Sequence, residues 1–352
     1  MKPLASLSLD LDNKWSYLKT HGDRGWEAFP SYLDRVVPYF LEILDQLSLR
    51  ITVFIVGQDA ALAKNSAALG SLTAAGHEIG NHSFHHEPWL HLYTPAEIED
   101  EIRIAEEAIL AATGQRPSGF RGPGYSSSPA LLACLARRGY QYDASSLPTI
   151  VGPLARTYYF LTAKLSNEQR QQRKQLFGNV ADGFKPLSPY WWHFAASCGG
   201  DEVPPLLEIP VTTLPLARVP IHFSYLLFLA QTSTAAAWGY WRMAIAACRS
   251  MRVEPSLLLH PLDVLGGDEE PELGFFPAMG MTGKAKRDLI ARFLGALQDS
   301  FSVVPLAEHA RIIATRKRIP IQRIACPAAA APREAFDAGA IAAPVIPLEA
   351  PQ

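Results

Sequence analysis

The stretch that decides the fold is LSLDLDNKW, Leu7–Trp15, near the start of the chain. Its first residues alternate apolar and polar side chains, which is the pattern of a half-buried β-strand. The strand pattern ends in two carboxylates, Asp10 and Asp12, which on a continuing strand would point to the same face. Two like charges beside a packed core repel each other and lose hydration. The pair therefore requires a compensating partner, which the rest of the sequence must supply.

The composition limits what the protein can be. The chain has 352 residues, of which 48% are hydrophobic, and a formal net charge of −2. This length is enough for one large α/β domain or two ordinary ones, with a sizeable core. No strongly basic block stands out, so the composition gives no reason to expect nucleic-acid binding. The four cysteines form no CxxC motif, which is typical of reduced thiols in a cytosolic protein.

The N-terminal residues and the most apolar segment bear on localisation. The first ten residues, MKPLASLSLD, predict a first strand rather than a signal peptide, so we expect a cytoplasmic protein. No run approaches the ~18 apolar residues that a membrane-spanning helix needs. The most apolar region, residues 223–248, is interrupted by polar residues and Gly239. It predicts a buried or amphipathic helix; the alternative is peripheral contact with the inner membrane surface.

Short β-like runs alternate with helical stretches along the chain. ITVFIV at 51–56 predicts a buried strand, and a capping-box threonine, Thr94, and Gly114 bound a predicted long helix. Further strand candidates lie at 206–210, 256–260 and 302–305. Such alternation predicts a parallel sheet, either doubly wound or closed as a barrel. No GxGxxG or GxxxxGKS loop follows any strand, so nothing supports a nucleotide site.

The strongest local signal for chemistry is GHEIGNHSFHHEPW, residues 76–89. His82 and His86 are four residues apart, so on a helical turn they would share one face. Imidazole is the commonest protein ligand for Zn²⁺, but the nearby His77 and His85 leave metal ligands and ordinary surface histidines equally open. The spacing becomes informative beside the aspartate pair. Two histidines and one carboxylate leave open positions for water and substrate, as catalytic metal sites do.

Such a site also needs a base, an acid and an oxyanion donor. The two aspartates can divide the work, one holding the metal and the other accepting a proton. LLLHPLD places His260 at the end of an apolar strand, where the catalytic residues of α/β barrels gather. FRGPGYS ends another strand with Arg121, and its Gly-Pro-Gly turn exposes backbone N–H groups.

These motifs follow one another in a recognisable order. SLDLDNKW, HSFHH, RGPGY, the YDAS at 142–145 and LLLHPLD resemble the ordered motifs of the polysaccharide deacetylase family (NodB-homology, carbohydrate esterase family 4), from about Leu4 to His309. The resemblance implies an α/β fold, a deformed, TIM-like (β/α)7 barrel with an inserted cap region. We expect the catalytic barrel at 1–315, with the insertion at about 151–205, and an Ala/Pro-rich C-terminal extension at 316–352.

The resemblance also implies roles for the acid–base residues. Asp10 matches the family's catalytic base, Arg121 the arginine that orients it, and His260 the general acid. The backbone around Tyr125 matches the oxyanion donor. Asp143 matches a motif carboxylate, which we expect to be supportive rather than catalytic.

Asp12, His82 and His86 match the family's metal ligands, for Zn²⁺ or another divalent ion such as Co²⁺, Mn²⁺ or Ni²⁺. The chain departs from many members because Leu11 separates the aspartates and Asn13 follows them. This spacing leaves the division of roles between the two aspartates open, and we predict that Asp12 holds the metal.

The expected reaction is metal-dependent removal of an acetyl or formyl group from an amino sugar. The predicted cytoplasmic location favours a cytoplasmic or lipid-linked glycan intermediate, and the apolar 223–248 segment favours the lipid-linked form. One alternative is a metal-independent cyclic amidase of the same fold, against which the Asp-His-His set argues. The other is a non-catalytic glycan-binding protein, which would not need Asp10 and His260.

Overall fold

The strands form one mostly parallel sheet, as the strand–helix alternation predicts. The computed structural model describes residues 2–151, 183–195 and 202–325. The hydrogen-bonded order is β10 (Ile321–Ile324), β6 (Tyr190–Phe194), β7 (Leu206–Glu208), β5 (Tyr142–Asp143), β4 (Gly119–Phe120), β3 (Glu78–Asn81), β2 (Thr52–Ile55), β1 (Leu4–Asp10) and β8 (Ser256–Leu259). A further strand, β9 (Ser302–Val304), pairs with the start of β1. Every pair is parallel except β6 with β7.

The sheet is open rather than closed. The structure confirms the α/β class and the strands expected around 51–56, 206–210, 256–260 and 302–305. Within the described ranges the sheet has ten strands, and β7 does not pair with β8. The reason is that β6 and β10 extend the sheet outward from β7. Past β7, the chain touches β8 at one point, where the Thr212 N–H donates to the Ser256 carbonyl at 2.9 Å. The expected deformed α/β barrel is confirmed as a fold class, but in the described ranges its sheet is open and has ten strands rather than seven.

Two strands lie in stretches that we assigned outside the main barrel. β6 falls in the expected insertion at 151–205, and β10 falls beyond residue 315, yet the two pair with each other in the same sheet. Most of the insertion and the tail from Cys326 lie outside the described residues. The domain boundaries stay predictions.

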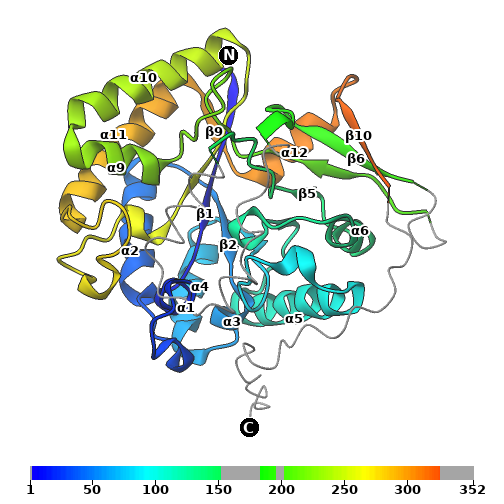
Figure 1. The fold of residues 1–352 in the computed structure, drawn as a ribbon, viewed down its shortest axis with the longest axis horizontal. Helices are drawn as coiled ribbons and strands as arrows, with labels where there is room; N and C mark the ends of the chain where they lie inside the picture. Colours follow the sequence, from blue (N-terminus) through cyan, green and yellow to red (C-terminus); the bar gives the residue numbers. More distant parts are fainter. Residues whose placement is uncertain (1, 152–182, 196–201, 326–352) are drawn as a thin grey trace.

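Helices connect the strands and cover the sheet (Figure 1). On one side of β1 lie α2 (Leu33–Gln46), α9 (Phe223–Thr232), α10 (Thr234–Ser250) and α11 (Gly283–Ser300), and on the other α5 (Pro95–Thr113) and α6 (Pro129–Arg137). The remaining α-helices of the described ranges are α1 (Lys14–His21), α3 (Gly57–Ala60), α4 (Ser66–Ala74) and α12 (Leu306–Ala314).

The helix expected at 94–114 is confirmed as α5. The Thr94 hydroxyl accepts the N–H of Glu97, the Glu97 carboxylate accepts the N–H of Thr94, and Gly114 ends the helix in the left-handed conformation. Glu101 is buried on the inner face of α5. This acidic side chain reaches the loop that follows β3, so the helix contributes to the site as well as to the core.

The apolar 223–248 segment forms α9 and most of α10, which pack against the core. Phe223, Leu226 and Trp241 are buried, whereas Phe228 is exposed. The expectation of a buried or amphipathic helix is confirmed. None of the helices in the described ranges is long and apolar enough to cross a membrane.

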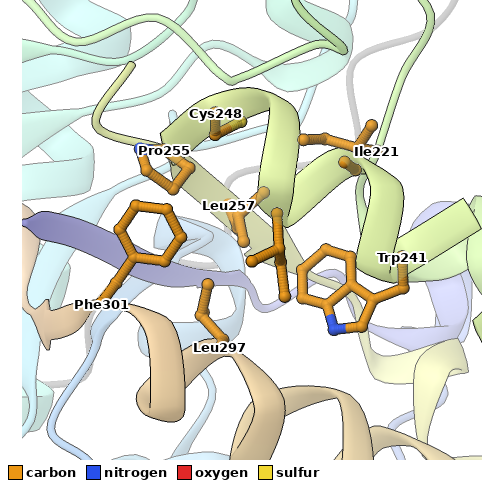
Figure 2. Close-up of a pocket in the computed structure, with 9 residues that line it drawn as sticks. Ile221, Trp241, Cys248, Pro255, Leu257, Leu297 and Phe301 are labelled. Carbon is orange, nitrogen blue, oxygen red and sulfur yellow. The ribbon is translucent and has the colours of Figure 1, made fainter. Parts of the chain in front are cut away.

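A small pocket lies between α10, α11 and β8 (Figure 2). Trp241, Leu257, Leu297 and Phe301 contribute to its walls, and every side chain that lines it is apolar or a thiol. The pocket adjoins the first half of β8, whereas His260 follows the last residue of that strand. Its titratable group is the Cys248 thiol, whose pKa burial raises to about 12, and the lining contains none of the predicted site residues.

We predict a pH dependence of stability from His77, which precedes β3. Its buried Nδ1 accepts the Ile51 N–H at 3.3 Å, and burial, together with the nearby Arg50 charge, lowers its pKa to about 4. Because the folded pKa lies below the ordinary 6.5, the neutral ring stabilises the fold fully above pH 6.5, and this contribution is lost as the pH falls toward 4. Urea unfolding at several pH values should show a loss of up to about 3 kcal/mol over this range. His77→Asn should flatten that part of the profile; an unchanged slope would contradict the assignment.

Candidate active site

Four strand ends bring the predicted site residues together. Asp10 is the last residue of β1, while His82, Arg121 and His260 each follow directly after β3, β4 and β8. All four strands are parallel in one sheet, so their carboxyl ends meet at one edge. The sequence predicted strand ends for Asp10, Arg121 and His260, whereas His82 was expected on a helical turn; the parallel pairing accounts for the convergence of all four.

A buried ion pair compensates Asp10. Arg121 Nη1 lies 3.0 Å from Asp10 Oδ1, and both side chains are almost fully buried. The guanidinium also donates to the Ala144 carbonyl at 3.0 Å and to the Ser8 hydroxyl at 3.2 Å, and it packs over the Phe54 ring. These contacts fix the arginine, and the arginine fixes the carboxylate of Asp10 in turn.

Asp12 has different partners from Asp10. The strand ends at Asp10, and the chain turns so that the Asp12 N–H donates back to the Asp10 carbonyl at 2.9 Å. Asp12 Oδ1 then lies 2.9 Å from His86 Nε2 and 3.3 Å from His82 Nε2. The aspartates are thus not on one continuing strand, as the alternating pattern suggested. Leu11 between them is buried in the main apolar core.

The histidine pair lies on a loop, and the expected helical turn is wrong. Ser83 and His86 have positive φ values of 62° and 55°, which a helix does not allow. Glu101 holds the loop, because its Oε1 accepts the N–H groups of Phe84 and His85 and its Oε2 lies 2.7 Å from His85 Nδ1. Strained non-glycine residues of this kind cluster at functional sites.

The donor set of Asp12, His82 and His86, here called the Asp-His-His trio, fits a divalent metal ion. Its ligand atoms lie within 4.8 Å of one another, and Asp12 Oδ1 is buried without a hydrogen-bond partner in the described part of the chain. The His82 Nδ1–H donates to the Arg121 carbonyl at 2.7 Å, which leaves Nε2 free as a ligand. Zn²⁺ and similar ions prefer this combination of imidazole and carboxylate ligands.

The electrostatics of the trio also favour a positive charge. Burial opposes ionisation of Asp12, but His86 and His82 outweigh it and hold the pKa of this carboxyl well below its ordinary value. Burial likewise opposes protonation of His82, yet Asp12 and Asp10 raise the pKa of its imidazole. The raised pKa of His82 shows that Asp12 and Asp10 favour a positive charge at its ring, on the side where a cation would lie.

His260 lies on the other side of Asp10. Its Nε2 is 4.0 Å from Asp10 Oδ2, and its side chain is about one-fifth exposed, so a substrate can reach it. On the opposite side of the ring, Nδ1 lies 3.2 Å from the hydroxyl of Ser224, at the start of α9. The base and acid predicted from the sequence are thus neighbours.

The turn at Tyr125 is less simple than the sequence suggested. Tyr125 has a φ of 62°, and its N–H donates to the Gly122 carbonyl at 2.9 Å within the turn. This backbone donor is already engaged in the structure, so its role toward an oxyanion stays a prediction. The Gly122 N–H is engaged too, because it donates to the Ser145 hydroxyl at 2.8 Å.

Asp143 lies behind that turn rather than in the site. Its Oδ1 accepts the Ser145 hydroxyl at 2.6 Å, so a chain of hydrogen bonds runs from Asp143 through Ser145 to Gly122, next to Arg121. Asp143 pairs across the sheet with Glu208, and burial and the charge of Asp143 raise the pKa of the Glu208 carboxyl. This placement agrees with the supportive role we expected for Asp143.

Several buried residues that organise the site were not among those predicted from the sequence. Asp59 is buried and accepts hydrogen bonds from the Asn13 amide at 2.7 Å and the Trp15 indole at 3.0 Å, and the Trp15 ring packs edge-on against His86. Burial raises the pKa of Asp59 to about 7, although Asn13 and Trp15 oppose the shift. The sequence NKW that follows the aspartates could have indicated these contacts, because Asn13 and Trp15 both donate hydrogen bonds to Asp59.

Comparison with known proteins points to one family. The polysaccharide deacetylase family model matches residues 23–142, which include His82, His86 and Arg121. A peptidoglycan deacetylase of Helicobacter pylori is 24% identical over 271 residues, covering 73% of this chain and 85% of that protein.

Solved structures support the same fold. A Mycobacterium smegmatis protein described as a polysaccharide deacetylase has a TM-score of 0.58 at 20% identity, covering 91% of this chain and 93% of that one. Puue allantoinase has a TM-score of 0.50 at 16% identity, covering 90% and 91% of the two chains. At these identities the two structures bear on the fold and not on the reaction.

We predict that Asp12→Asn weakens Zn²⁺ binding by at least about 100-fold, because the trio loses its only anionic ligand. The measurement is isothermal titration of metal-stripped protein with Zn²⁺. The matched control is Asp34→Asn, the same change at an exposed aspartate on α2, and it should leave Zn²⁺ affinity unchanged. Wild-type affinity in Asp12→Asn would exclude the proposed ligand set.

Proposed function

Since this chain belongs to the polysaccharide deacetylase family, we propose that it is a metal-dependent hydrolase that removes N-acyl groups from amino sugars of a glycan. The observation that carries the proposal is the Asp-His-His trio beside the buried Asp10–Arg121 pair and His260. A binding protein would not need a carboxylate and an imidazole set 4.0 Å apart as base and acid.

The trio would hold a divalent ion, which we propose to be Zn²⁺ or a similar metal. When bound, the ion supplies Lewis acidity toward the acyl carbonyl and toward water. Asp12 contributes the anionic ligand and the two histidines contribute neutral Nε2 atoms. The hydrogen bond from His82 Nδ1–H to the Arg121 carbonyl keeps that tautomer in place.

Asp10 accepts the proton that the attacking water loses. Its partner is the Arg121 guanidinium, whose Nη1 lies 3.0 Å from Asp10 Oδ1 in a buried ion pair. The same contact prevents the carboxylate from rotating away from the trio. Arg121 therefore acts through Asp10, as a positioning residue, and needs no contact with the substrate.

His260 supplies a proton to the departing amine. The carbon–nitrogen bond of the amide breaks as the nitrogen takes the Nε2 proton, which gives a free amino sugar and a carboxylate such as acetate. The 4.0 Å between His260 Nε2 and Asp10 Oδ2 places the acid and the base close enough to act on one carbon centre. Asp10 gains one proton from water and His260 loses one from Nε2; transfer of the Asp10 proton to Nε2 restores both groups, and the acid product loses its remaining proton to solvent.

For the substrate we propose an N-acylated amino sugar carried on a glycan intermediate, with a lipid-linked form as the favoured one. The support is the position of α9, which starts beside His260 and exposes the apolar side chain of Phe228, with Tyr225 on the same helix partly exposed. An apolar surface next to the acid suits a substrate with a lipid carrier at a membrane surface.

We predict that Asp10→Asn lowers kcat by about 10²- to 10⁴-fold while Zn²⁺ affinity stays near the wild-type value. The assay measures acetate and formate release from chitin oligomers, peptidoglycan fragments and N-acylated sugar lipids. Because Arg121 loses its buried partner, Zn²⁺ binding serves as the check that the site still folds. Asp34→Asn, an exposed aspartate on α2, is the control and should retain full activity.

Two results would contradict the proposed function. One is that Zn²⁺-loaded wild-type protein releases no acetate and no formate from any of the N-acylated substrates tested. The other is full activity in Asp10→Asn, because water would then lose its proton without the base.

A further inference from the structure

The first turn of α9 meets the turn after β8 at His260. The Ser224 hydroxyl lies 3.2 Å from His260 Nδ1 and donates to Asp263 Oδ1 at 2.8 Å. The other oxygen of Asp263, Oδ2, accepts the backbone N–H of His260 at 2.8 Å. Asp263 is 1% exposed, and each of its carboxylate oxygens accepts a hydrogen bond from a group beside the imidazole.

We propose that Ser224, oriented by Asp263, is a positioning residue that holds His260 in the tautomer with hydrogen on Nδ1, so that Nε2 faces Asp10. The inference rests on the proposed function only in giving His260 the role of general acid. Nothing in the sequence motifs singles out Ser224, because it lies in the apolar 223–248 segment and not beside a predicted site residue.

The direction of the hydrogen bonds follows from counting hydrogens. A serine hydroxyl carries one hydrogen, and an ionised carboxylate can only accept. If Ser224 gives its hydrogen to Asp263, its oxygen can only accept from the imidazole, which requires hydrogen on His260 Nδ1. Nε2 is then the nitrogen that gains and loses a proton during turnover. Its 4.0 Å separation from Asp10 Oδ2 places that nitrogen on the side of the reacting groups.

The turn that carries Asp263 is held from a second side. Lys286 on α11 is fully buried, and its Nζ donates to the Leu262 carbonyl at 2.8 Å. Its positive charge also opposes the rise in the pKa of Asp263 that burial causes. The carboxylate that orients Ser224 is therefore fixed by the backbone of His260, by the hydroxyl and by α11.

Other groups around His260 do not compete for Nδ1. In the described ranges, Ser224 is the side chain within hydrogen-bond distance of that nitrogen. The His222 ring lies 6.0 Å from the His260 ring, centroid to centroid, and burial lowers the pKa of His222, so it is a neutral neighbour. Asp10 faces the opposite nitrogen. The nearest backbone donor, the Asp263 N–H, donates to the His260 carbonyl at 2.9 Å, which leaves Ser224 as the side chain that can set the tautomer.

The direct test is the tautomer of His260, read from its ¹⁵N chemical shifts by NMR in the full chain loaded with Zn²⁺. The His260 signals are assigned by their absence in His260→Gln. The wild type should show hydrogen on Nδ1 in the neutral ring. Ser224→Ala should give a mixture of tautomers, Ser224→Thr should restore the wild-type pattern, and Thr232→Ala, an exposed residue on the same helix, should change nothing.

Asp263→Asn gives the sharpest result. Its amide oxygen would accept the His260 N–H, so its NH₂ group would face Ser224 and donate to the hydroxyl. Ser224 would then donate to Nδ1, and the neutral ring should switch to hydrogen on Nε2, as expected for a relay of one-way hydrogen bonds. This variant also serves if Ser224→Ala does not fold. An Nε2–H tautomer in the wild type, or no change of tautomer in either variant, would overturn the inference.

Kinetics with N-acetylated chitin oligomers separate positioning from binding. Ser224→Ala should lower kcat about tenfold with an unchanged KM, and Ser224→Thr should recover to within about threefold. A change in KM alone, with kcat unaltered, would overturn the positioning role. If the wild type turns over no substrate, the proposed function fails, whereas the tautomer measurement still decides the role of Ser224.

Discussion

The buried ion pair between Arg121 and Asp10 is the interaction on which the rest of the structure depends. Removing one partner from such a pair typically costs 3–5 kcal/mol, because the other charge is left buried and unpaired. Arg121 also binds the Ala144 carbonyl and the Ser8 hydroxyl, while its own carbonyl receives the Nδ1–H of His82. One residue thus connects β1, β4, the segment after β5 and the loop after β3.

That arrangement explains how two aspartates two positions apart are tolerated next to a core. The chain turns after Asp10, so each carboxylate faces its own positive partner: Arg121 for Asp10, and the two imidazoles, or a metal ion, for Asp12. The separation of partners also separates the proposed roles. A carboxylate held by a guanidinium is oriented as a base, whereas a carboxylate between two histidines is oriented as a ligand.

The parts predicted from the sequence are those that local patterns determine. Strand periodicity placed Asp10, Arg121 and His260 at strand ends, and parallel pairing then brought them to one edge. The conformation of the loop from His82 to His86 could not be predicted, because Glu101 on α5 holds it by accepting the N–H groups of Phe84 and His85. Ser224 could not be predicted for a related reason. Its proposed role depends on the packing of α9 beside the end of β8, which residue spacing in the sequence does not predict. The open edge depends likewise on long-range pairing of β6 with β10.

Anomalous diffraction from crystals grown with Zn²⁺ tests the central claim most directly, because it locates the ion without assuming any activity. We expect one strong peak at about 2.0–2.2 Å from an Asp12 oxygen and from Nε2 of His82 and His86, with Asp10 still paired to Arg121. If the protein hydrolyses N-acyl sugars while the ion lies elsewhere, or while the trio holds no ion, the proposed metal site is wrong.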